Sequence, residues 1–382
     1  MEWIDLDGKT QSKASSKEEI KLLFEKYTLG ITGPELEKID NLHAHILDHK
    51  HEIFPFLKLY CRVSPTQKDN IIKSLIKAGY NPSMCGDGSN DVGALKRAVI
   101  GVALLNSDEI TDKKDKHKQF NILSLEDETT INSGDVTAAA PFTSKSGSIK
   151  CVKNIFIQGR CTLVITFQMF KILALNCFLT AYSSSILALK GIKFSDYQVT
   201  YLGFIVAFFF LMLSKAEPLK KISKHKPPTT ILTLESLISI IGQAFCNLVS
   251  LYLIMEMTRE YDPDSLQIVK SFDDPFAPTL MNSIIYIYTA LNSTINFVVN
   301  YQGEPYMQKM SENKWLMRLI YFVLGISAIV IFDIHQPLNE GLELLPLPED
   351  IMYKFKFIGI MACNFIISYL LENWKKLLGY YK

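Results

Sequence analysis

The chain has 382 residues, a formal net charge of +1 and seven cysteines. A charge this close to neutral gives no electrostatic reason to expect a nucleic-acid partner. The cysteines form no C-x-x-C pair, which indicates free thiols rather than a disulfide framework or a zinc site. Hydrophobic residues make up 48% of the chain, but they are concentrated after about residue 150. The composition therefore predicts two parts, a polar one at 1–147 and an apolar one at 148–382.

The polar part contains a run, residues 59–105, that reads as strand, helix, strand, helix, strand. Ser64 is typical of a helix N-cap, with Pro65 at the first helical position and Gln67 completing a capping box. The first helix is predicted to stop at Gly79. This alternation predicts a parallel, doubly wound α/β sheet of the Rossmann-like kind, in which ligands bind at the C-terminal ends of the strands.

The turn after the second of these strands carries the candidate phosphate chemistry. Asp87 and Asp91 supply the hard oxygen ligands that Mg²⁺ prefers. Gly86 and Gly88 allow the backbone to turn tightly and to approach an anion without a Cβ clash.

Two more polar side chains belong to the same prediction. The amide of Asn90 can donate a hydrogen bond to a phosphoryl oxygen, and Lys68 can reach the same point as a compensating cation. The alternative is an Asx-rich turn with no ligand, a use that loops of every kind make of these residues. A capped, lysine-bearing helix one strand earlier favours the phosphate site.

The end of the polar part has two segments of different character. Residues 106–133 are polar and lack periodicity, so they are predicted to be a flexible insertion, with a regulatory role as the alternative. From about Ser148 a helix is predicted to run unbroken into the first apolar segment.

Six apolar segments are each long enough to cross a hydrocarbon core of ~30 Å. They are residues 161–189, 196–214, 231–256, 279–300, 315–333 and 351–371. Lysines gather in the segment 215–226 and in the tail 375–382, whereas 257–278 is acidic and 334–350 has no Lys or Arg. The bias of positive residues toward the cytoplasm predicts that both termini of this chain are cytosolic, in contact with a lipid membrane that it crosses six times.

Polar residues inside these spans leave alternatives open. Lys171 is predicted either to line a membrane path with Gln168 and Asn176 or to lie near the cytoplasmic face and extend its stem outward. Asn292, Asn296 and Asn300 recur every four residues on one face of the fourth span. That spacing favours hydrogen bonds between helices over a transport path.

Several motifs resemble one known family. Residues 62–68 read RVSPTQK and residues 85–95 read CGDGSNDVGAL, similar to the hinge and magnesium motifs of P-type ATPases in the haloacid-dehalogenase superfamily. Cys85, where most classes have threonine, resembles the fifth class. The segments GDVTAAAPFTSK at 134–145, QGRCTLV at 158–164, QMFKILALN at 168–176 and KFSDYQ at 193–198 resemble its endoplasmic-reticulum subgroup A.

The resemblance implies a haloacid-dehalogenase-like partial phosphorylation domain followed by an all-α transmembrane domain in the endoplasmic-reticulum membrane. It implies that Asp87 and Asp91 serve Mg²⁺ and that Lys68 and Asn90 hold the phosphoryl group. It also implies ATP-driven removal of mistargeted transmembrane helices, with cation transport or a catalytically inactive membrane scaffold as alternatives.

The sequence also departs from the family pattern. The phosphorylated Asp-Lys-Thr-Gly-Thr motif does not occur in these 382 residues. We therefore expect the chain to be the C-terminal portion of a longer ATPase, to be inactive by itself, and to need the missing N-terminal portion as a partner before ATP can be used.

Overall fold

The computed structural model describes residues 2–4, 11–13, 17–42, 54–105, 140–261 and 276–377. The predicted insertion at 106–133 lies outside these residues. The chain divides into two compact units, Met1–Ile155 and Phe156–Lys382. Each unit is described by itself.

The first unit opens with a short antiparallel pair, β1 (Glu2–Ile4) and β2 (Gln11–Lys13). Helix α1 (Lys17–Lys26), strand β3 (Gly30–Thr32) and helix α2 (Gly33–Leu42) follow. Strand β4 (Leu59–Cys61) pairs with β3 in parallel. A small core that includes Ile20, Leu36 and Phe54 packs α1 and α2 around this pair.

The predicted order of strand, helix, strand, helix and strand at 59–105 is confirmed. Strand β4 leads to helix α4 (Pro65–Lys77), then β5 (Ser83–Gly86), α5 (Val92–Arg97) and β6 (Ile100–Leu104). Strand β7 (Phe142–Ser144) adds to β6, so β5, β6 and β7 form a three-stranded parallel sheet.

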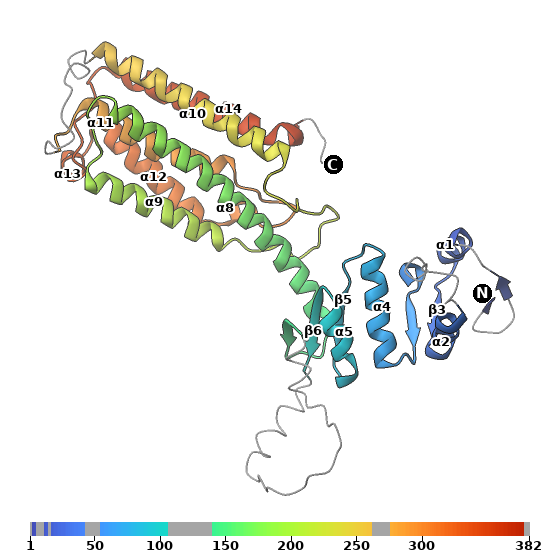
Figure 1. Cartoon of the computed structure of the whole chain (residues 1–382). Helices are drawn as coiled ribbons and strands as arrows, with labels where there is room; N and C mark the ends of the chain where they lie inside the picture. The colour runs from blue at the N-terminus through green and yellow to red at the C-terminus, as the bar shows by residue number, and fades with distance from the viewer. Residues whose placement is uncertain are drawn as a thin grey trace, which may run out of the picture. The chain divides into compact units, whose positions relative to one another are not determined.

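The prediction of one continuous doubly wound sheet is wrong for the residues described. They form two separate parallel sheets, β3–β4 and β5–β6–β7 (Figure 1). Helix α4 follows β4 and packs against α5, which covers the second sheet. An exposed ion pair between Asp69 of α4 and Arg97 of α5, 3.0 Å long, joins the same two helices. The helices thus connect two sheets that share no strand pairing.

The second unit is a bundle of long helices (Figure 1). They are α8 (Lys150–Ala188, whose first turns belong to the first unit), α9 (Asp196–Ser214), α10 (Leu234–Tyr261), α11 (Leu280–Val299), α12 (Lys314–Ile331) and α14 (Ile351–Leu377). A short helix, α13 (Gln336–Gly341), precedes α14. Helix α9 begins at the predicted Asp196, where Ser195 and Gln198 form a capping box. The prediction of an unbroken helix from about Ser148 is confirmed by α8.

Five helices in the described part of the chain are long and apolar enough to cross a membrane. They are α8, α9, α10, α12 and α14. The helix at the predicted fourth span, α11, does not reach that hydropathy, because asparagine, serine and threonine occupy many of its positions.

Helix α11 lies at the centre of the bundle and is nearly all buried. It packs against α9, α10, α12 and α14. Its asparagines bond to neighbouring helices as their spacing predicted: Asn296 donates to Asn176 of α8 at 2.9 Å, and Asn300 donates to Gln243 of α10 at 2.9 Å. Asn292 accepts from Asn364 of α14 at 2.8 Å. A helix enclosed by other helices has polar partners within the protein, so its mean hydropathy can be low.

Candidate functional site: an incomplete phosphate site and a buried membrane network

The position of Lys68 is fixed by the start of α4. Ser64 caps the helix, and the side chain of Gln67 returns to accept a hydrogen bond from the Ser64 backbone amide at 2.8 Å. The amide group of Gln67 also donates to the carbonyl of Gly33 at 2.9 Å. These bonds tie the first turn of α4 to the β3–α2 turn, so Lys68 is held at the end of the β3–β4 sheet.

Asp91 is the partner of Lys68. The Lys68 ammonium donates to Oδ1 of Asp91 at 2.7 Å. Asp91 is buried, with 6% of its surface exposed, and it lies directly against Gly86 at the end of β5. A Cβ built on Gly86 would come within 2.5 Å of Asp91 Oδ2 and 2.7 Å of its Cβ. Glycine at position 86 is therefore what allows the carboxylate to lie over the strand end.

The remaining predicted residues surround this pair. Asp87 and Asn90 are exposed in the turn between β5 and α5. The carboxylate of Asp87 has no hydrogen bond or ion pair with the residues that the structure describes, so it is free to bind a cation. Gly88 has an ordinary extended backbone, and a Cβ there would meet nothing closer than 3.9 Å. A Cβ would therefore clash with the protein itself at Gly86 and not at Gly88, while the approach of an anion to these two glycines stays a prediction.

Cys85 precedes this turn. Burial raises the pKa of its thiol, and Cys151 together with the carboxylates of Asp87 and Asp91 raises it further. A raised pKa keeps the thiol protonated at neutral pH, and a protonated thiol is neither a nucleophile nor a metal ligand. Cys85 thus contributes a small neutral side chain to the strand end.

The carboxylates suit Mg²⁺, although they do not complete a site. Oδ1 of Asp91 is engaged by Lys68, and Asp87 offers an exposed carboxylate one residue after β5. Mg²⁺ is commonly held by one or two carboxylates, with water and phosphate oxygens as the other ligands. Within the described ranges no three His, Cys, Asp or Glu side chains form a group that would hold a metal ion. The two carboxylates therefore fit part of a magnesium site, and the oxygens of a bound phosphate would supply further ligands.

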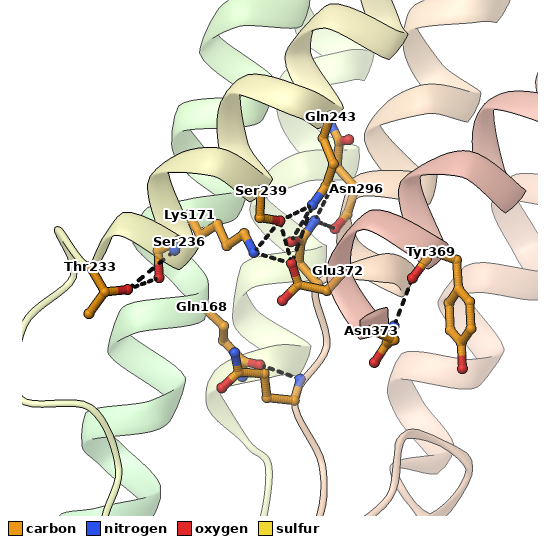
Figure 2. A network of polar contacts seen from close by, with 12 residues as sticks. Gln168, Lys171, Thr233, Ser236, Ser239, Gln243, Asn296, Tyr369, Glu372 and Asn373 are labelled. Carbon is orange, nitrogen blue, oxygen red and sulfur yellow. Dashed lines mark hydrogen bonds and ion pairs between the residues drawn. The ribbon is translucent and has the colours of Figure 1, made fainter. Parts of the chain in front are cut away.

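Lys171 lies in a second polar cluster, inside the helical bundle (Figure 2). Its ammonium forms an ion pair with Glu372 of α14 and donates to Ser239 of α10 at 2.9 Å. Gln243, one turn further along α10, donates to Ser239 at 2.9 Å and connects the cluster to Asn300. Only 8% of the Lys171 side chain and 13% of the Glu372 side chain are exposed. Lys171 therefore extends across the bundle toward another helix, and not outward along its stem.

Gln168 and Asn176 lie on the same buried face of α8 as Lys171. Gln168 accepts from the backbone amide of Gln302 at 2.8 Å, and Asn176 accepts from Asn296 at 2.9 Å. Within the described part of the chain, the buried side-chain nitrogen of Asn176 has no hydrogen-bond partner. The three predicted path residues therefore face the bundle interior and are engaged mostly with other side chains and backbone.

Glu372 was missed by the sequence analysis. The sixth span was predicted to end at residue 371, but α14 continues to Leu377 and carries this carboxylate into the bundle. A cue was present in the sequence, because a lysine inside a span requires an opposite charge nearby.

No family model matches the chain. It is 32% identical to a probable manganese-transporting ATPase of Arabidopsis thaliana over 98% of its own length. It is also 32% identical to an endoplasmic reticulum transmembrane helix translocase of Schizosaccharomyces pombe, and 29% identical to one of Saccharomyces cerevisiae, each over 93% of this chain.

A lysine–carboxylate pair at a strand end together with a bundle of apolar helices is consistent with a membrane ATPase. The relatives define the class further: the chain is homologous over nearly its whole length to P-type ATPases of the fifth class. It spans 36% of the length of each of these three relatives.

The contact between Gly86 and Asp91 generates a prediction about stability. Gly86→Ala should destabilise the β5–α5 region by about 1–3 kcal/mol, the range for forcing a methyl group into a packed site. Gly88→Ala is the matched control and should change stability by at most about 0.5–1 kcal/mol. Hydrogen exchange of the amides at 83–97 in both variants measures the difference. Equal protection of these amides in the two variants would contradict the close contact between Gly86 and Asp91.

The Lys171–Glu372 pair generates a second prediction about stability. Lys171→Met leaves a buried carboxylate without its counter-charge and should cost about 3–5 kcal/mol. The double variant Lys171→Met/Glu372→Met should recover most of that loss. Thermal unfolding in detergent of Lys171→Met, Glu372→Met and the double variant measures the coupling, with Glu304→Gln, in the exposed pair with Lys309, as the control for a surface charge. Additive losses from the two single changes would mean that the charges do not interact.

Proposed function

We propose that this chain is the C-terminal portion of an ATP-driven translocase of the endoplasmic-reticulum membrane, which removes mistargeted transmembrane helices. The observation that carries the proposal is the Lys68–Asp91 ion pair, held over Gly86 at a strand end. The names of the fungal relatives and their similarity over nearly the whole chain support the translocase activity and the location.

The proposed roles follow from the chemistry of each group. Asp87 and Asp91 hold Mg²⁺, which neutralises charge on the phosphoryl group when it is bound. Asp91 also orients Lys68, and Lys68 and Asn90 hold the phosphoryl oxygens. The absence of a Cβ at Gly86 allows Asp91 to lie over the strand end, and the absence of a Cβ at Gly88 leaves room for the phosphate to approach the backbone.

The two separate sheets support the need for a further portion of the protein. Neither β3 nor β5 has a second strand partner among the described residues. An unpaired strand edge is a template for another strand. We propose that the missing strand, which carries the phosphorylated aspartate, pairs with such an edge and so completes a haloacid-dehalogenase-like domain. ATP then binds only to the assembled protein.

The membrane part is proposed to span the bilayer six times, with α11 as the enclosed fourth span and both chain ends cytosolic. Because α8 begins beside the phosphate site's residue Cys85 and continues into the bundle, it is proposed to couple the two units. Gln168, Lys171 and Asn176 are proposed to line the cargo path. The buried, unpartnered nitrogen of Asn176 supports this role.

Cation transport is the second candidate. The Arabidopsis relative, named a probable manganese-transporting ATPase, favours it. The structure offers Glu372 as a buried acidic ligand, but that carboxylate is engaged by Lys171. Release of Glu372 from Lys171 would therefore have to precede its use as a cation ligand.

Phosphorylation by ATP tests the proposal. The isolated chain should form no hydroxylamine-sensitive acyl-phosphate, since it has no nucleophilic aspartate in the family motif. Co-expression with the N-terminal two thirds of the Schizosaccharomyces pombe relative should give labelling. Asp87→Asn and Lys68→Met should each lower the initial rate about 10²–10³-fold, the usual loss when one group that stabilises transition-state charge is removed.

Lys77→Met is the matched control, because Lys77 is exposed in the last turn of the same helix. Labelling is normalised to the amount of the two portions that co-purify. Labelling of the isolated chain, or full labelling of the Asp87→Asn complex, would contradict the assignment.

A further inference from the structure

A groove of about 740 Å³ lies between α10 and α14, helices that run side by side in the bundle (Figure 1). Its walls are mostly apolar. The lining side chains include Cys246, Val249 and Leu253 of α10 and Gly359, Cys363 and Ile367 of α14. Among the lining residues, Leu253 and Ile367 are about half exposed, so the groove opens away from the protein core. This volume is typical of a site for a small ligand.

Small residues at four-residue intervals keep the groove open. Cys246 and Ser250 lie one turn apart on α10, and Gly359 and Cys363 lie one turn apart on α14. A Cβ on Gly359 would meet no atom within 4 Å. The floor is closed by Asn364, which donates hydrogen bonds to Asn292 and Asn247. The open volume is therefore bounded by protein beneath and would be filled from the side that faces lipid.

The groove has the length of one leaflet. From Lys356 to Ile367 the α14 wall advances 11 residues (367 − 356), which at 1.5 Å per residue is about 16 Å. Half of a ~30 Å hydrocarbon core is about 15 Å. A docked transmembrane helix needs contact across the whole core, whereas an acyl chain needs only its own leaflet. The length favours a lipid.

The charges of the groove are gathered at one end. Among the described residues that line the groove, the charged ones are Glu256, Glu260 and Lys356, and the opposite end is formed by Phe245 and Ile367. Neither Lys356 nor Glu260 has an ion pair within 4 Å among the described residues; Lys356 interacts electrostatically with Asp350 just before α14, and Glu256 is 3.7 Å from Arg259. One ammonium beside two carboxylates complements a head group that itself carries both signs. An anionic head group would meet one cation and two like charges.

We propose that this groove binds one zwitterionic phospholipid. Its phosphate lies at Lys356, its ammonium group at Glu256 and Glu260, and an acyl chain lies along Gly359 and Cys363. The site rests on the proposed membrane embedding of the bundle, but not on any step of ATP use. It is separate from the Lys171 cluster, which lies toward the other ends of α10 and α14.

The test uses the full chain in nanodiscs made from equal parts of phosphatidylethanolamine, phosphatidylcholine and phosphatidylglycerol. Native mass spectrometry after mild detergent release counts the lipids that remain bound. The wild-type chain should retain one phosphatidylethanolamine or phosphatidylcholine in preference to phosphatidylglycerol. Retention of phosphatidylethanolamine would show that the site prefers a primary ammonium group, and retention of phosphatidylcholine that it prefers a quaternary one.

Two variants examine the two halves of the site. Gly359→Leu fills the groove and should abolish retention. Gly325→Leu, at an equally open and exposed glycine of α12, is the matched control and should retain the lipid. Lys356→Gln removes the cation that faces the phosphate and should weaken retention of the zwitterionic lipid about fivefold or more, as expected for one basic group near a membrane surface. Circular dichroism and flotation with vesicles confirm that each variant is helical and inserted.

Retention of phosphatidylglycerol as strongly as the zwitterionic lipids would overturn the proposal, as would unchanged retention in Gly359→Leu. Equal loss in Gly325→Leu would also overturn it. If Gly359→Leu is not inserted, Cys363→Phe takes its place as the variant that fills the groove. Failure of the wild-type chain itself to float with vesicles would count against the membrane assignment, and so is distinguished from failure of the lipid site.

Discussion

A polar group inside a membrane must find its hydrogen-bond partner within the protein, because lipid offers none. The arrangement of the bundle follows from this constraint. Among the helices of the described bundle, α11 carries the most buried polar side chains, and it is the helix that the others enclose. Asn282 bonds to Gln198 of α9, Tyr288 donates to the carbonyl of Asn247 in α10, and Thr289 donates to Ser183 of α8. Each bond fixes a neighbour at a definite height along α11.

The same constraint explains Lys171. A lone ammonium in the bundle interior would be costly, and Glu372 and Ser239 accept its hydrogen bonds, while Gln243 donates to both of these acceptors. These partners come from α10 and α14, helices far from α8 in sequence. The cluster therefore fixes α8 to that helix pair, while the asparagines fix α8 to α11. Membrane helices gain little from the hydrophobic effect against one another, so such bonds and close packing define the bundle.

Local chemistry made much of the structure predictable from sequence. The capping boxes at Ser64 and Ser195 depend on residues three positions apart, and both are present. The order of elements around the phosphate turn followed from periodicity and turn residues. The Lys68–Asp91 pair followed from the rule that polar groups gather where parallel strands end.

Other features depended on partners that no local pattern specifies. Which strands pair in a sheet depends on contacts between segments that are distant in sequence. The division into two sheets could therefore not be read from local patterns. Glu372 was placed outside its span because a hydropathy window ends at the first charge, although a buried lysine can accommodate that charge. The segment of α11 was predicted as a span, but the partners of its polar side chains on neighbouring helices could not be read from the sequence.

The central claim is that α11 crosses the membrane in spite of its polarity. Glycosylation mapping tests it most directly, with acceptor sites inserted one at a time at residues 301–312, which follow α11, and at 342–349, which follow α12. If α11 spans, a chain expressed in microsomes will be glycosylated at 342–349 and not at 301–312. Glycosylation at 301–312 but not at 342–349 would mean that α11 does not cross, and would contradict the account.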